Sequence, residues 1–189
     1  SANRGEPKLG DGGAFTNGSV GEGLVLASTL LGESAWFAAS KRAADYSWYQ
    51  WENNQNYAAF ALWHLAALFE VDKDPRWLEK AVYLARYFVV RDIGLSGAQG
   101  GHNFFTGYAD ITLKGLARLL AVLPADHEFC GLLKDKTIRF ANQILSRQQP
   151  DGLFAGRNRK YLGYKCLASG LFFVAEALPD QAERLAPAL

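Results

Sequence analysis

The chain has 189 residues, of which 49% are hydrophobic and 13% aromatic, and its formal net charge is +1 at pH 7. This length suits one domain with a substantial core. A charge near zero, with Lys and Arg spread along the chain, argues against a nucleic-acid-binding protein. No apolar run reaches the roughly 18 to 20 residues that a membrane-spanning helix needs.

Apolar residues recur at helical spacing through most of the chain. In chain order, helices are expected at residues 20–31, 35–49, 57–69, 76–90, 110–123, 128–146 and 161–178, followed by a short closing helix. Pro75 suits the first turn of the fourth helix, where the missing N–H has no helical partner in any case. No segment has a convincing strand pattern, and "YFVVRDIGL" (87–95) is the nearest to one. The sequence therefore predicts an all-α fold.

Short and long connections alternate between these helices. The short ones are "LGES", "EVDKDP", "LPADHE" and "LPDQ", and the long ones are "WENNQN", "GLSGAQGGHNFFTGY" and "RQQPDGLFAGRNRKY". A helical hairpin therefore recurs at a period of roughly 40 to 55 residues, which is the spacing of stacked helical units. We expect helical hairpins in series.

Two glycine-containing stretches also echo each other, "GDGGAF" (10–15) and "QQPDGLF" (148–154). With the alternating hairpins, they resemble the Gln-x-x-Asp-Gly-x-aromatic turn that closes hairpins in α/α toroids. That group includes six-hairpin glycosidases, α/α polysaccharide lyases and terpenoid-cyclase-like barrels. The resemblance covers almost the whole chain and implies a partial or small α/α toroid acting on a carbohydrate.

Complete toroids of this group usually have about six hairpins, whereas this sequence predicts roughly four. We expect residues 1–189 to form one α/α-hairpin domain, either an open array or the C-terminal part of a longer toroid. The chain contains no Met, which favours a processed or excised chain whose partner is the remainder of a longer chain or a second subunit. It would be periplasmic or secreted if a signal segment was removed, and otherwise cytoplasmic.

The toroid resemblance implies that the long loops and the following helix starts converge on one funnel. Glu22 lies nine residues after Gly13, and Asp110 lies nine residues after Gly101. We expect both carboxylates in first helical turns, with Asn56 at the matching position of the second hairpin. Two carboxyl groups across a sugar could serve as acid and base or as acid and nucleophile. Capping of the helix ends explains the same two residues without catalysis.

The segment "GGHNFFTGYAD" adds His102, Asn103 and Tyr108 to this expected funnel. His and Tyr can act as base and acid in proton abstraction beside a uronate carboxylate, while an Asn holds that carboxylate. His102 is the strongest single candidate because the pKa of a histidine lies near neutrality. A hydrogen bond that braces the loop is the alternative for His102, and simple packing is the alternative for Tyr108.

Two further loops suit sugar binding. "SWYQWENNQN" combines a tryptophan with polar groups, and "GRNRKYLGYK" combines basic and aromatic residues that could hold an acidic polymer. The expected substrate-binding residues in these loops are Trp51, Glu52, Asn54, Arg157, Arg159 and Tyr161. An exposed, solvated loop is the alternative for the basic group.

No motif for a metal or a cofactor is present. The three histidines lack zinc-site spacing, and there is no phosphate-binding or dinucleotide-binding glycine motif. His64, within the third helix, is expected in the core. We therefore expect a carbohydrate-active domain without a cofactor, with lyase or hydrolase chemistry both open. The alternative is a non-catalytic hairpin module that binds a glycan or a protein, or completes a larger enzyme. An isoprenoid cyclase ranks below both because the chain lacks an Asp-rich metal cluster.

Overall fold

The computed structural model describes residues 13–48, 55–97, 106–150, 154 and 163–186. The described elements are α1 (Gly13–Leu31), α2 (Ser34–Ser47), α3 (Gln55–Asp72), α4 (Pro75–Leu84), η1 (Ala85–Val89), η2 (Val90–Asp92), α5 (Thr106–Val122), α6 (Cys130–Leu145), α7 (Gly163–Ala177), η4 (Pro179–Gln181) and α8 (Ala182–Leu185). Beyond isolated bridges such as Gln148 with Phe154, the described residues form no strand. The expected all-α fold is confirmed.

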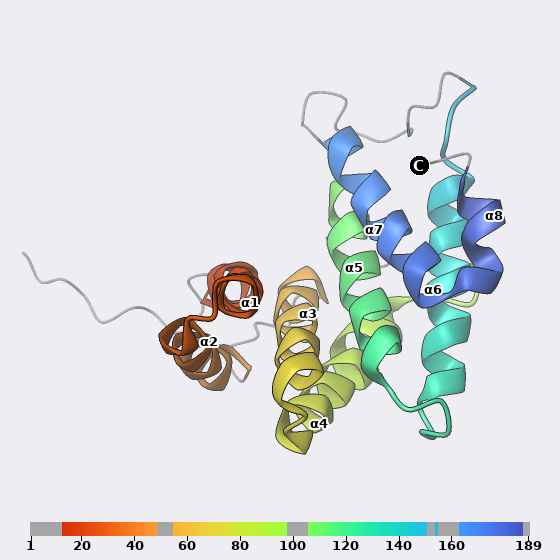
Figure 1. The fold of residues 1–189 in the computed structure, drawn as a ribbon. Helices are drawn as coiled ribbons and strands as arrows, with labels where there is room; N and C mark the ends of the chain where they lie inside the picture. Colours follow the sequence, from red (N-terminus) through yellow and green to blue (C-terminus); the bar gives the residue numbers. More distant parts are fainter. Residues whose placement is uncertain (1–12, 49–54, 98–105, 151–153, 155–162, 187–189) are drawn as a thin grey trace, which may run out of the picture.

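The helices form two layers. α1, α3, α5 and α7 pack on one another in sequence, and we call them the odd layer. α2 packs on α1, α4 on α3, α6 on α5 and α8 on α7, and these make up the even layer. Figure 1 shows the hairpins following one another from α1–α2 on the left to α7–α8 on the right. The expectation of helical hairpins in series is therefore confirmed.

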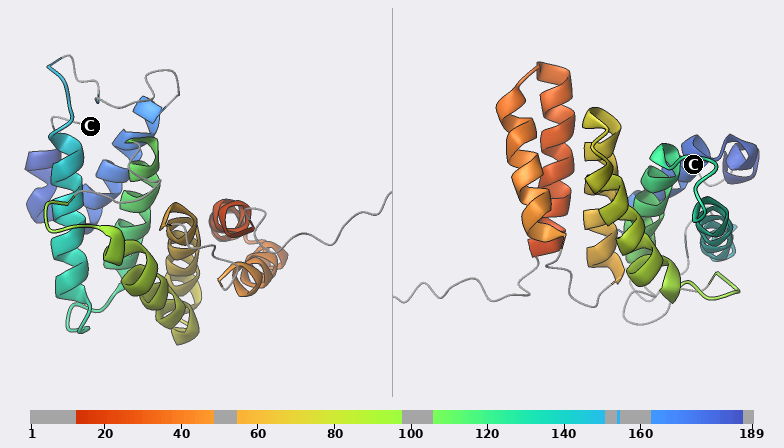
Figure 2. Two further views of the ribbon diagram at one scale, coloured as in Figure 1. Left: turned by 180° about the vertical axis from the view of Figure 1, so that it is seen from behind. Right: turned by 90° about the horizontal axis from the view of Figure 1, so that it is seen from below.

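Short connections fix the direction of the helices. Only residues 32–33 separate α1 from α2, and only residues 73–74 separate α3 from α4, so the chain must reverse at once. Gly32 (φ +74°) takes the left-handed backbone conformation that this reversal needs. Each of these hairpins is consequently antiparallel. The right-hand view of Figure 2 shows α1 and α3 beginning at the same end, and Figure 1 shows α5 and α7 both beginning at the top. Their N-termini therefore gather at one end of the layer.

The fourth helix begins as the sequence predicts. Asp74 caps α4 by accepting a hydrogen bond of 3.1 Å from the backbone N–H of Arg76, and Pro75 occupies the first turn. The segment 87–95, the nearest to a strand in the sequence, continues α4 as the π-helical η1 and the 3₁₀-helical η2. Helical packing against α3 overrides its β-branched composition.

The core is centred on α3, which is buried at every residue from Gln55 to Leu68 except the partly buried Tyr57. Trp77, Phe129 and Phe140 fill the space between the layers. His64 is fully buried, and its Nε2 lies 2.8 Å from Ser40 Oγ. The expectation that His64 is a core residue is confirmed.

A glycine lies at each contact between odd helices. An added Cβ would lie 2.6 Å from the Phe60 carbonyl at Gly18, 3.0 Å from the Ala59 oxygen at Gly115, and 2.8 Å from the Asp110 oxygen at Gly170. Distances this short leave no room for a side chain, so the helix backbones approach directly. Any residue larger than glycine at these points would push the helices apart.

The outer edge of the first hairpin is apolar and exposed. Several α1 side chains are uncovered, namely Phe15, Val20, Leu26, Leu30 and Leu31. Among the helices described, none combines the length and the apolar character needed to cross a membrane.

Candidate functional site

Eight of the twelve predicted site residues lie outside the described residues. They are Trp51, Glu52, Asn54, His102, Asn103, Arg157, Arg159 and Tyr161. The described candidates are Glu22, Asn56, Tyr108 and Asp110, one or more from each of α1, α3 and α5. The described part of the candidate site therefore comes from these three helices.

The expected helix starts at residues 20 and 110 are wrong. α1 begins at Gly13 and α5 at Thr106, so neither Glu22 nor Asp110 lies in a first turn. The first turns of α1 are held by tertiary contacts, since Phe15 packs edge-on against Phe60 with ring centroids 4.6 Å apart. Such packing overrides the low helix propensity of the glycines in this stretch. The capping explanation for Glu22 and Asp110 therefore does not apply.

Asp110 is a buried carboxyl group, 8% exposed, between α5 and α7. Its Oδ1 accepts a 2.5 Å hydrogen bond from the backbone N–H of Gly170. Burial raises the pKa of Asp110 to about 6, although the Gly170 N–H, the charge of Lys114 and the Ser169 hydroxyl each act to lower it. A carboxylic acid in this state holds its proton at mildly acidic pH, as a general acid must.

Glu22 lies along α5 rather than beside Asp110. Its carboxylate pairs with Lys114 and, at 3.3 Å, with Arg118, and Arg118 also reaches Glu70 at 3.5 Å. Lys114 and Arg118 are one and two helical turns beyond Asp110. Lys114 is therefore the shared neighbour of the two predicted carboxylates, as an ion-pair partner of Glu22 and as a positive charge acting on Asp110.

Aromatic rings hold these two cations in place. The Lys114 ammonium lies 4.0 Å from the centroid of the Trp63 ring and 5.4 Å from that of Phe173. The Arg118 guanidinium lies 5.1 Å from the Phe173 centroid. A cation over an aromatic face gains electrostatic attraction, and more so when it is partly buried. We call Glu22, Trp63, Lys114, Arg118 and Phe173 the odd-layer cluster, because every helix of that layer contributes to it.

The other two candidates lie near the N-terminal ends of the same helices. Asn56 is the second residue of α3 and is buried, and Tyr108 is the third residue of α5 and is half-buried. Both remain candidates by position. In the described part of the chain, no group of three or more His, Cys, Asp or Glu side chains is placed to hold a metal ion.

Sequence reasoning missed most of the odd-layer cluster, although one signal was available. Asp110, Lys114 and Arg118 are spaced four residues apart, which places them on one face of a helix. Their partners on α1, α3 and α7 could not be read from the sequence, because those contacts join residues far apart in the chain.

The structure is similar to two solved carbohydrate-processing proteins. A protein titled glycosyl hydrolase family 88, from Bacteroides vulgatus, superposes with a TM-score of 0.67 at 13% identity, over 89% of this chain and 57% of its own. A protein titled polysaccharide lyase superposes with a TM-score of 0.67 at 15% identity, over 89% of this chain and 56% of its own. The chain has an α/α-toroid fold.

The similarity does not extend to sequence. No protein-family model matches this α/α-toroid chain, and no curated protein sequence matches it. The chain spans a little over half the length of the two solved structures. The fold is shared, and the activity has to be inferred from the residues.

Proposed function

We propose that this chain is a carbohydrate-active domain that acts on a polysaccharide at the N-terminal end of the odd layer. The proposal rests mainly on Asp110. Burial raises the pKa of this carboxyl group to about 6, and it lies in the second turn of α5. Two solved α/α toroids whose titles name a glycosyl hydrolase and a polysaccharide lyase support the class of substrate. Strongly perturbed carboxyl groups concentrate at functional sites.

Hydrolase chemistry assigns different work to two carboxyl groups. Asp110 would donate its proton to the oxygen of the scissile glycosidic bond, so that the leaving sugar departs as an alcohol. Water would then add to the anomeric carbon and return its proton to Asp110. Glu22, ion-paired with Lys114 and Arg118, would hold Lys114 in position so that its positive charge acts on Asp110. Lys114 ties the two groups together electrostatically.

Two details of this proposal have alternatives: the substrate is either neutral or acidic, and the reaction is that of either a hydrolase or a lyase. The acidic preference rests on the basic segment around Arg157 and Arg159, and lyase chemistry rests on His102 and Tyr108. A lyase breaks the bond by abstracting the proton beside a uronate carboxylate, which leaves an unsaturated sugar. A hydrolase leaves none.

The test is an activity screen of the chain on neutral and acidic polysaccharides. It follows new reducing ends together with the ultraviolet absorbance of an unsaturated uronate. Asp110→Asn should reduce turnover at least about a hundredfold, the scale of a lost general acid. Asp126→Asn, an exposed aspartate in the connection before α6, is the matched control and should retain turnover. Reducing ends with the absorbance assign a lyase, and reducing ends alone assign a hydrolase.

A non-catalytic module is the second candidate, and it is favoured by the burial of Asp110 and by the ion pairs of Glu22 with Lys114 and Arg118, which also suit a structural role. A folded chain that is silent on every substrate but retained by polysaccharide would support this candidate and contradict the catalytic one.

A further inference from the structure

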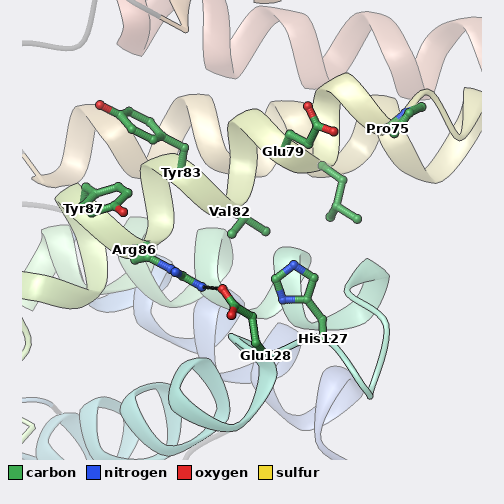
Figure 3. Close-up of a pocket in the computed structure, with 9 residues that line it drawn as sticks. Pro75, Glu79, Val82, Tyr83, Arg86, Tyr87, His127 and Glu128 are labelled. Carbon is green, nitrogen blue, oxygen red and sulfur yellow. Dashed lines mark hydrogen bonds and ion pairs between the residues drawn. The ribbon is translucent and has the colours of Figure 1, made fainter.

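A hollow of about 450 Å³ lies on the even side of the molecule, away from Asp110 and the odd-layer cluster. One wall is the continuous α4–η1 helix, and the other is the segment that leads into α6 (Figure 3). Its lining residues are Pro75, Leu78, Glu79, Val82, Tyr83, Arg86, Tyr87, His127 and Glu128. We call this hollow the even-side groove.

Two tyrosine rings lie at one end of the even-side groove. Tyr83 is 42% exposed and Tyr87 is 50% exposed, and their ring centroids are 5.0 Å apart at an angle of 51°. Figure 3 shows both rings on the helix wall, one turn apart. Exposed aromatic faces offer apolar surface with a polar hydroxyl at the rim, which matches the C–H face and the surrounding hydroxyls of a sugar ring. Tyr87 belongs to the π-helical η1, and π-helical turns occur frequently at functional sites.

An ion pair crosses the even-side groove. The Arg86 guanidinium donates a 2.6 Å hydrogen bond to Glu128 Oε1, and it lies 5.0 Å from the centroid of the Phe129 ring. The charges of Arg86 and Glu128 therefore already neutralise each other. An anionic ligand would have to displace Glu128, whereas a hydroxyl-rich neutral ligand can accept from Arg86 and donate to Glu128 while the pair stays intact.

His127 adds a donor whose position is fixed. Its Nδ1 accepts a 3.1 Å hydrogen bond from the backbone N–H of Phe129, so the neutral ring carries its proton on Nε2. Figure 3 shows the His127 ring beside Glu128 and facing the helix wall, where the Glu79 carboxylate points away from it. An imidazole donor therefore lies beside the Arg86–Glu128 ion pair, and a sugar hydroxyl can accept from it.

We propose that the even-side groove is a second carbohydrate-binding site, which takes a neutral glycan. Tyr83 and Tyr87 stack on the sugar, while Arg86, His127 and Glu128 bind its hydroxyls. This site lies apart from the proposed catalytic end of the odd layer and holds the polymer without cleaving it.

The test is native gel electrophoresis through gels that contain a neutral polysaccharide, either β-glucan, galactomannan or xylan, beside gels that contain polygalacturonate. Wild-type protein should be retarded in at least one neutral gel. Tyr87→Ala should raise the apparent Kd for the polysaccharide roughly two- to tenfold, the range expected for one aromatic contact. Tyr83→Ala/Tyr87→Ala should abolish the retardation. Tyr87→Phe keeps the ring face and should retain most of it.

Tyr46→Ala is the matched control, because Tyr46 is similarly exposed, at 43%, but lies on α2. It should be retarded like the wild type, and circular dichroism should show every variant folded. Retardation in no neutral gel, retardation in polygalacturonate alone, or full retardation of the double tyrosine variant would each overturn the proposal. Asp110→Asn should lose turnover and keep retardation, so the two proposals fail independently.

Discussion

His64 on α3 packs directly against Gly21 on α1, so closely that a Cβ atom at Gly21 would overlap the imidazole ring. Ser40 Oγ donates a 2.8 Å hydrogen bond to the Gly21 carbonyl and lies 2.8 Å from His64 Nε2. A hydroxyl has one proton to donate, so Nε2–H must donate to Ser40. Nδ1 is then an acceptor without a partner among the described residues. Three helices meet at this contact.

Gly21→Ala should therefore destabilise the protein by about 1 to 3 kcal/mol, the usual cost of overpacking a core. Gly23→Ala is the matched control two residues further along α1, where an added Cβ meets nothing within 4 Å. That change should stabilise by up to about 1 kcal/mol, because alanine is the better helix former. Urea unfolding of both variants measures the difference. Equal stability of the two variants would mean that α1 does not pack on His64 this closely.

Asp110→Asn should raise stability at pH 8 while abolishing turnover. Burial raises the pKa of Asp110 from 3.8 to about 6, so its ionisation opposes folding above pH 6, by about 3 kcal/mol at most. The amide keeps the acceptor for the Gly170 N–H without a charge. We expect a gain of about 1 to 3 kcal/mol in urea unfolding at pH 8. A loss of stability at that pH would show that the ionised carboxylate is favourably held.

His64 and Asp110 should give opposite pH dependences. Burial lowers the pKa of His64 from 6.5 to about 4, so its contribution to stability is complete above pH 6.5 and is lost as the pH falls towards 4. The contribution of Asp110 is complete below pH 3.8 and is lost as the pH rises through 6. Between pH 4 and 6 the two effects offset each other.

Single variants separate these effects. In Asp110→Asn, stability should fall by about 3 kcal/mol between pH 6.5 and 4, because of the two buried groups only His64 still titrates. In His64→Gln, stability should instead increase as the pH falls from 6 to 4. Urea unfolding at half-unit pH intervals provides the measurement. Parallel pH profiles for the two variants would contradict both assignments.

Lys114→Met should cost about 1 to 3 kcal/mol, because it leaves a half-buried Glu22 with one cation fewer and removes the charge above Trp63. Adding Glu22→Gln should recover part of that loss, which gives a coupling energy in a double-mutant cycle. Lys134→Met is the control, since its pair with Asp180 is about half exposed on both sides and should contribute under about 1 kcal/mol. A coupling energy of zero would remove Glu22 from the odd-layer cluster.

The sequence predicted the hairpins well because helical periodicity and turn residues are local signals. Asp74 and Pro75 are neighbours in the sequence and mark the start of α4. In the structure, Asp74 caps the helix and Pro75 occupies its first turn. The starts of α1 and α5 were missed because the glycines and aromatics before Glu22 and Asp110 read as loops. Contacts with α3, such as that between Phe15 and Phe60, 45 residues apart, hold the first stretch in a helix.

The candidate site was less predictable for the same reason. Glu22 meets Lys114 and Arg118 across 92 and 96 residues, a pairing that no local pattern encodes. The burial that raises the pKa of Asp110 depends on α7 folding back onto α5 at Gly170. A sequence can indicate a carboxylate at a helix end, but its protonation follows from neighbours that are set only by the fold.

The glycines of the odd layer also determine the shape of the row. Odd helices approach backbone to backbone at Gly18, Gly115 and Gly170, whereas α4 and the segment before α6 stand far enough apart to leave the even-side groove. The α3–α4 and α5–α6 hairpins therefore stand closer together on the odd side than on the even side, which tilts one against the other. The same tilt opens the even-side groove that Tyr83 and Tyr87 line.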